Sequence, residues 1–451
     1  MAATLINRFD LPPRAWPAPV DAAGFADCVD YAARRDPYGD AVHTALGCVY
    51  LFCAGLSTAT ESIAFVLLVG YTILRLPNLW RGLAPIVAAP VAWALFALFA
   101  WAALSGAWAA DAAQWRDALG GFRGLLIVPA LYPIRSAWRL LLGSLIAGMT
   151  LQGAMQILQQ LGLMSVRMER TDVRFAGLHT NPVQASLFEA VALMVALGWM
   201  RETRSWRTRG LLIACALFLA AGIAIAAGRA AIVGLGVAIP LLGVLLVRFH
   251  GAPWRRLLAI AAVAVVGASV VAGGVVALGS KGLRRQLGDV TALDDPRTST
   301  GQRILWWKAA THAALEHPIL GLGTGSSRTM LANDAGVQAA IARYPELPRE
   351  AFLPAHPHSM YLQTACELGV VGLAALALVI VTTARASWRA AAERPIRAAL
   401  AAAIALWAVA AAFEALHMSG CTACLLGALV ALVVVPYRHR NEPATRACGD
   451  G

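Results

Sequence analysis

The stretch AIVGLGVAIPLLGVLLV, residues 231–247, indicates the fold class, because it carries no charge and is long enough for a helix to cross a bilayer. Similar runs recur along the 451 residues, of which 59% are hydrophobic and 14% charged. A soluble globular protein has about 25% charged residues. Only helices and closed barrels span lipid, and these runs are too long for barrel strands. We therefore expect an all-α polytopic membrane protein.

The apolar runs predict about twelve transmembrane helices. They lie near residues 41–57, 60–77, 84–104, 121–134, 140–161, 185–200, 210–227, 231–247, 257–279, 359–384, 398–416 and 420–436. The chain then divides into three parts. Residues 1–279 hold an N-terminal segment and nine helices, residues 280–357 form a large polar loop, and residues 358–451 hold three helices and a tail.

The net charge of +12 comes almost entirely from arginines in short connectors, such as 201–209, 248–256 and 385–397. With twelve crossings these connectors share one side with both chain ends, and the positive-inside rule makes that side cytoplasmic. The loop 280–357 then faces the opposite side. Because the charge is spread over these connectors, we expect membrane lipids and no nucleic acid as partners.

The long loop is expected to be partly helical. Ser299 or Thr300 can cap a helix that ends near Glu316. The glycines of 321–325 predict a turn, and a second short helix is expected over 326–343. A loop of this length in a membrane protein predicts binding or chemistry.

His358 stands where this loop meets the apolar run 359–384. The positive end of a helix dipole disfavours imidazolium, and a neutral imidazole at a wet interface can act as a general base near pH 7. His356 is the competing candidate. The alternative is a histidine that only anchors the helix among lipid headgroups.

Three arginines lie on the same predicted outer side. They are Arg229 at a helix end, Arg303 on the loop helix, and Arg174 in another outward connector. Snorkelling would also explain Arg229, and a solvated surface would explain Arg303. Together they could bind a phosphate or pyrophosphate, because the guanidinium fork matches such oxygens.

Two glutamates lie inside predicted spans, where each is costly unless satisfied. Glu367 is nine residues after His358, on the opposite helix face and about 13 Å deeper, so we expect a structural role. Glu414 is ambiguous. Outward loops lack an Asp-x-Asp pair and the chain lacks a P-loop, so we expect no catalytic metal, no cofactor and no ATP hydrolysis.

The sequence His358-Ser359-Met360-Tyr361-Leu362-Gln363, followed by Glu367-Leu368-Gly369-Val370-Val371-Gly372-Leu373, resembles the signature of the O-antigen ligase and polymerase superfamily. That register selects His358 over His356, although the family usually has Asn where Ser359 stands. Three more stretches are similar to the family: Arg174-Phe175-x-Gly177 with Asn181-Pro182, Gly228-Arg229-Ala230-Ala231, and Arg303-x-x-x-Trp307 followed by His317-Pro318-x-x-Gly321-x-Gly323.

The resemblance implies an enzyme of the inner membrane of a Gram-negative bacterium with its active site on the periplasmic side. Such an O-antigen ligase moves a glycan from undecaprenyl diphosphate to a sugar hydroxyl of the lipid A–core. The resemblance implies that His358 is the base. Arg229 and Arg303, with Arg174, would hold the diphosphate, and direct displacement would invert the anomeric carbon.

Three alternatives remain open from the sequence. An O-antigen polymerase and a protein O-oligosaccharyltransferase use the same kind of donor, and the large loop just before the histidine motif favours the ligase. A transporter of the lipid-linked glycan would predict internal repeats and helices broken near the midplane of the membrane.

Overall fold

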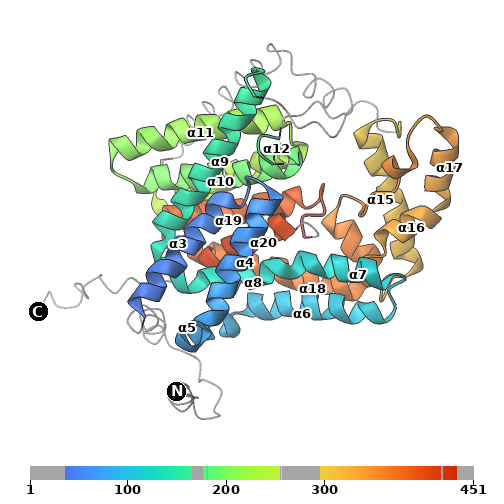
Figure 1. Cartoon of the computed structure of the whole chain (residues 1–451), viewed down its shortest axis with the longest axis horizontal. Coiled ribbons are helices and arrows are strands. Elements are labelled where there is room, and N and C mark those ends of the chain that lie inside the picture. The colour runs from blue at the N-terminus through green and yellow to red at the C-terminus, as the bar shows by residue number, and fades with distance from the viewer. Residues whose placement is uncertain are drawn as a thin grey trace, which may run out of the picture.

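The structure is a computed structural model that describes residues 36–164, 176–179, 181–253, 255, 295–417 and 420–433. Within these ranges every regular element is a helix, which confirms the all-α class (Figure 1). In the N-terminal part these are α3 (Pro37–Cys53), α4 (Thr58–Leu74), α5 (Leu76–Ala88), α6 (Pro90–Leu104), η1 (Ser105–Ala107), α7 (Ala112–Leu119), η2 (Gly120–Arg123), α8 (Gly124–Leu131), η3 (Tyr132–Ala137), α9 (Trp138–Gln160), α10 (Pro182–Glu202), α11 (Trp206–Ala226) and α12 (Arg229–His250). In the C-terminal part they are α15 (Ser299–Glu316), α16 (Ser327–Asn333), α17 (Ala335–Arg343), η4 (Arg349–Ala351), α18 (Met360–Ala391), α19 (Pro395–Ala410) and α20 (Gly420–Val433).

A helix or a run of short helices lies at every predicted span except 257–279, which falls outside the described residues. Six of the described helical segments are long and apolar enough to cross a membrane, and three shorter apolar helices accompany them. These helices support the class of helical membrane protein. The number of crossings and the side on which the loop lies stay predictions.

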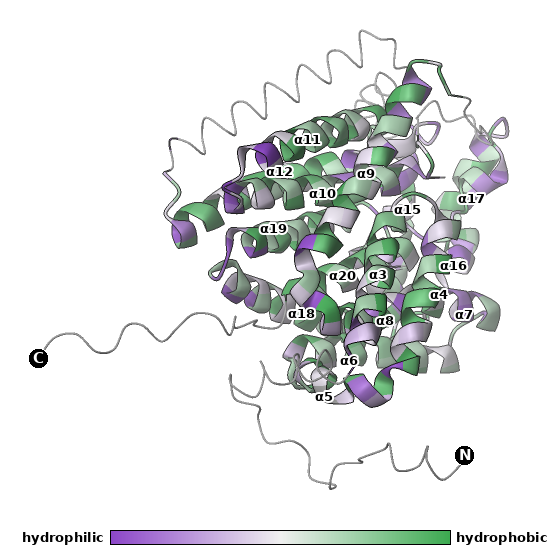
Figure 2. Cartoon of the chain, turned by 60° about the vertical axis from the view of Figure 1, so that its left-hand side comes forward, coloured by the Kyte–Doolittle hydropathy of each residue, from purple (hydrophilic) through white to green (hydrophobic). Residues whose placement is uncertain are grey.

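The helix α10 lies at the centre of the bundle, where it packs against α9, α11, α12 and α19. Small residues permit this packing, since a Cβ on Gly198 of α10 would overlap Ala399 of α19. In Figure 2 these helices are mostly hydrophobic, and hydrophilic segments lie at helix ends. Such a pattern suits a bundle whose sides face lipid.

The helices α15, α16 and α17 gather at one side of the molecule (Figure 1). The predicted helix ending at Glu316 is confirmed, but its cap is Thr298, whose hydroxyl accepts a 3.0 Å hydrogen bond from the Gly301 amide. The single helix expected over 326–343 is wrong. Asp334 interrupts it and caps α17, accepting from the Val337 amide at 2.9 Å.

The helix α18 is broken at Gly369, where φ is +62° and ψ is −161°. Residues 318–323 run beside the break and replace the lost helical hydrogen bonds. The Leu322 amide donates to the Cys366 carbonyl at 2.9 Å, and the Val370 amide donates to the Pro318 carbonyl at 2.8 Å. A Cβ at residue 369 would overlap the Ile319 carbonyl, so the break requires glycine.

Glu367 secures this junction from the α18 side. Its Oε1 accepts hydrogen bonds from the Ser327 amide at 3.2 Å and from the Ser327 hydroxyl at 2.5 Å. The same oxygen accepts from the side-chain Nε2 of Gln363 at 3.2 Å. These contacts agree with the structural role expected for Glu367, because they fix the start of α16 against α18.

Candidate functional site

His358 lies directly before α18 and is the residue around which the site is built. Its φ is +53°, a left-handed conformation that few residues other than glycine adopt. Its ring stacks on Trp306 of α15 with a centroid distance of 5.2 Å and an interplanar angle of 24°. The side chain remains 25% exposed, so a substrate can reach it.

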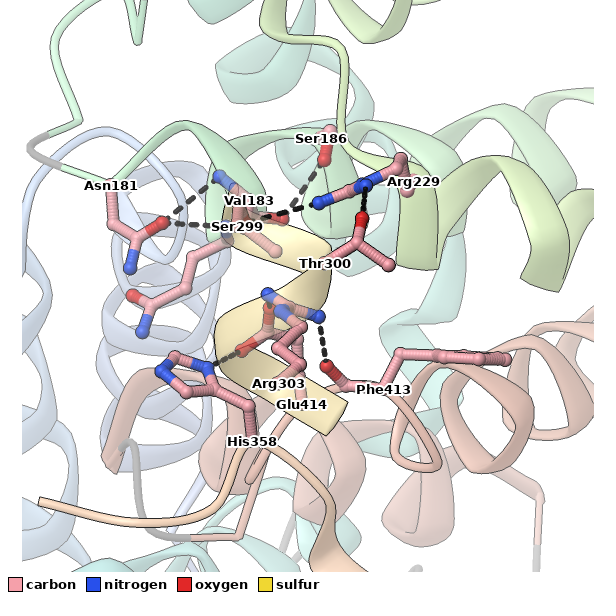
Figure 3. A network of polar contacts seen from close by, with 11 residues as sticks. Asn181, Val183, Ser186, Arg229, Ser299, Thr300, Arg303, His358, Phe413 and Glu414 are labelled. Atoms are coloured by element: carbon pink, nitrogen blue, oxygen red, sulfur yellow. Dashed lines mark hydrogen bonds and ion pairs between the residues drawn. The ribbon is translucent and has the colours of Figure 1, made fainter. Parts of the chain in front are cut away.

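Glu414 is the hydrogen-bond partner of His358. It lies in the turn after α19, and its Oε2 is 2.8 Å from Nδ1 of His358 (Figure 3). Its Oε1 accepts from a terminal nitrogen of Arg303, whose other terminal nitrogen donates to the Phe413 carbonyl at 2.6 Å. One buried carboxylate therefore joins the histidine to an arginine.

Opposing effects set the charge of Glu414. Burial raises the pKa of this carboxyl, but the charge of Arg303 and the hydrogen bond with His358 outweigh burial and lower the pKa to about 2. Glu414 is therefore a carboxylate at neutral pH, and it can only accept hydrogen bonds. This places the proton of a neutral His358 on Nδ1 and leaves Nε2 as an acceptor.

This arrangement is that of a base oriented by a carboxylate, as in enzymes that pair histidine with an acidic residue. The sequence did not identify Glu414, because His358 and Glu414 are 56 residues apart. The sequence shows only that Glu414 lies in an apolar run. A glutamate in such a run implies a partner, but the sequence does not indicate which residue that partner is.

Arg229 begins α12 and contacts the first turn of α15. Its terminal nitrogens donate to the Thr300 hydroxyl at 2.6 Å and to the Ser299 hydroxyl at 3.1 Å (Figure 3). Arg303 projects from the next turn of the same helix. The start of α15 thus brings Arg229 and Arg303 into one region with His358 (Figure 3).

The remaining candidates are placed differently. Arg174 lies outside the described residues, so its position relative to the other two arginines stays a prediction. The ring of His356 lies 4.6 Å from that of His358, at an interplanar angle of 67°. Burial, and after it the neighbouring His358, lower the pKa of His356 to about 3. Of the two histidines, His358 is the one with the carboxylate partner.

A cavity of about 410 Å³ opens beside this region, with walls from α6, α8, α12, α18, α19 and α20. Its lining is almost entirely apolar. Met360 and Tyr361, which follow His358 closely in the chain, and His417, which follows Glu414, belong to that lining. The cavity could therefore hold a hydrocarbon chain whose polar end is at the site.

Residues 214–377 match the model of a protein family described as O-antigen ligase. No curated protein matches the chain. The matched region contains Arg229, Arg303 and His358, whereas Arg174 and Glu414 lie outside it. The match confirms the resemblance that the histidine and arginine motifs indicated.

Proposed function

We propose that this chain, a member of the O-antigen ligase superfamily, is a glycosyltransferase that moves O-antigen glycan from undecaprenyl diphosphate to a sugar hydroxyl of the lipid A–core. The observation that carries the proposal is the pairing of His358 with Glu414 and Arg303. In this proposal the protein resides in the inner membrane of a Gram-negative bacterium, and the site opens on the periplasmic side.

In the proposed reaction His358 acts as the base. Glu414 holds the Nδ1 proton, so Nε2 is free to take the proton of the acceptor hydroxyl. The acceptor oxygen forms a bond with the anomeric carbon of the donor as the bond from that carbon to the diphosphate oxygen breaks. The diphosphate leaves with the electron pair, and the anomeric configuration inverts.

The arginines stabilise the leaving group in this proposal. Arg229 is held by the hydroxyls of Ser299 and Thr300, and exchanging such contacts for phosphate oxygens would add the attraction of opposite charges. Arg303 already orients Glu414, and because a guanidinium carries five N–H donors, it can also contact an anion. Arg174 is proposed as a third contact.

The apolar cavity supports a lipid-linked donor. A polyprenyl chain attached to the diphosphate would enter the cavity near Met360, Tyr361 and His417, while the diphosphate stays with the arginines. The polyprenyl chain would be removed from water, and the charged diphosphate would remain beside Arg229 and Arg303.

The other candidate functions differ in what the site must do. A polymerase or a protein O-oligosaccharyltransferase would use the same base and differ in the acceptor. A transporter would use a broken helix to line a substrate path. In α18 the backbone groups at the break are occupied by residues 318–323, which favours an enzyme.

The test is transfer by the reconstituted protein, supplied with lipid-linked O-antigen and purified lipid A–core in the presence of EDTA. The decisive variant is His358→Asn, because asparagine tolerates a positive φ and can still donate to Glu414 but cannot accept the proton. His312→Asn, at an exposed position on α15, is the matched control.

We expect transfer by the wild type and by His312→Asn, and none by His358→Asn. Longer lipid-linked chains without transfer to the core would instead identify a polymerase. Movement of the lipid-linked glycan across the bilayer without either product would overturn the enzyme proposal.

A further inference from the structure

His356, which lies beside His358, and His417, three residues after Glu414, each carry a buried nitrogen without a hydrogen-bond partner among the described residues. Nδ1 of His356 and Nδ1 of His417 make no hydrogen bond within the part of the chain that the structure describes. Buried polar atoms in proteins are nearly always hydrogen-bonded. These two atoms therefore require an explanation.

Both rings belong to the same neighbourhood. His356 lies against His358, and His417 is close enough to His356 to act on it electrostatically. His417 also lines the apolar cavity. Both residues keep part of their surface exposed.

The two rings are uncharged at neutral pH. Burial lowers the pKa of His417 to about 4, and burial followed by the neighbouring His358 lowers that of His356 to about 3. A neutral imidazole offers one N–H donor and one acceptor nitrogen. This combination complements hydroxyl groups, which both donate and accept, and it lacks the positive charge that would attract a phosphate.

We infer that His356 and His417 form a subsite that binds hydroxyl groups of a neutral sugar next to His358. The inference rests on the proposed function, and it assigns the subsite to the acceptor. Arg229 and Arg303 supply the positive charge for the donor's diphosphate. The uncharged rings are left for the substrate whose hydroxyl must approach Nε2 of His358.

The test separates binding of the acceptor from binding of the donor. Each histidine is changed to leucine, which removes both nitrogens, and to asparagine, which returns a polar group to the position of Nδ1. The exposed control is His312→Leu on α15. Initial rates are measured while lipid A–core and lipid-linked O-antigen are varied separately, and thermal unfolding is recorded for every variant.

For His356→Leu and for His417→Leu we expect the KM for lipid A–core to rise about 3- to 10-fold, the loss of one hydrogen bond between neutral groups. The kcat of both variants and the donor KM of His356→Leu should stay within about twofold, as one such bond is uniform binding energy. The asparagine variants should recover most of the acceptor affinity.

An unchanged acceptor KM in soundly folded leucine variants would overturn the subsite, and so would an equal rise in both KM values of His356→Leu. If a leucine variant fails to fold, phenylalanine takes its place, because it keeps the ring without the nitrogens. Absence of transfer by the wild type would instead contradict the proposed function, so the two failures are distinguishable.

Discussion

Replacing Glu414 by glutamine tests the mechanism at its centre. The carboxylate accepts from Arg303 with one oxygen and from His358 with the other. A glutamine amide has a single oxygen, so it cannot accept from both. If the oxygen stays with Arg303, the amide nitrogen faces Nδ1 of His358. The imidazole proton then moves to Nε2, which can no longer act as the base.

The magnitude follows from two quantities. The fall of the Glu414 pKa from its usual 4.5 to about 2 corresponds to roughly 3 kcal/mol in favour of the charged form. A positioned general base contributes about 10²- to 10⁴-fold to a rate, and a wrong histidine tautomer costs about 10⁴-fold in serine proteases. We therefore expect Glu414→Gln to lower kcat by at least about 10²-fold.

The assay is glycan transfer to lipid A–core at saturating concentrations of both substrates, with both KM values measured separately. Glu316→Gln is the control, because Glu316 is also a glutamate near a histidine but is 57% exposed. Its Oε1 lies 3.7 Å from Nε2 of the exposed His312. A Glu414→Gln protein that unfolds as the wild type does and keeps kcat within about threefold would refute the role of Glu414. The kcat of Glu414→Asp should lie between those of the wild type and Glu414→Gln, because a side chain shorter by one methylene cannot reach both Arg303 and His358 at their present positions.

Three further predictions concern stability and substrate binding. The pKa of Glu414 is lowered in the folded state, so the stability that its carboxylate gives the folded protein is complete above pH 4.5 and is lost as the pH falls toward about 2. The unfolding temperature of the wild type should therefore fall across that pH range more than that of Glu414→Gln, and parallel curves would contradict this. Gly369→Ala should destabilise the protein by about 1–3 kcal/mol or more in thermal unfolding, because φ is +62° and a Cβ would meet backbone; Gly236→Ala, where a Cβ meets nothing, is the control, and equal unfolding temperatures would count against a required break. Gly228→Ala should raise the KM for the lipid-linked donor, because its Cβ would overlap α10 and displace Arg229, and an unchanged donor KM would argue against that role of Arg229.

The helices were predictable because their signal is local. An apolar run of membrane length is evident in the residues themselves, as at 231–247, and α12 covers that run. The glycine turn at 321–325 was predictable for the same reason, and Gly321, Gly323 and Gly325 all have positive φ. Each of these features depends only on residues close together in the chain.

The break in α18 and the partner of His358 were not predictable from local pattern. Gly369 lies in an apolar run that continues on both sides, and its conformation depends on residues 318–323, about fifty positions earlier. The role of Glu414 depends on its contacts with Arg303 and His358, which lie far from it in the chain. Tertiary pairing decides both features, and only the family resemblance indicated which histidine to examine.

The helix α15 explains why the motifs occur in one chain. Its first turn binds Arg229 through Ser299 and Thr300, its next turn carries Arg303, and Trp306 stacks on His358. Its far end leads into the segment 318–323 that fills the break in α18. Because α15 is held at both ends, a shift of this helix would change the position of the arginines and of the base together. The proposed diphosphate site and the proposed base therefore share one rigid support, which is what a displacement reaction requires of groups acting on opposite sides of one carbon atom.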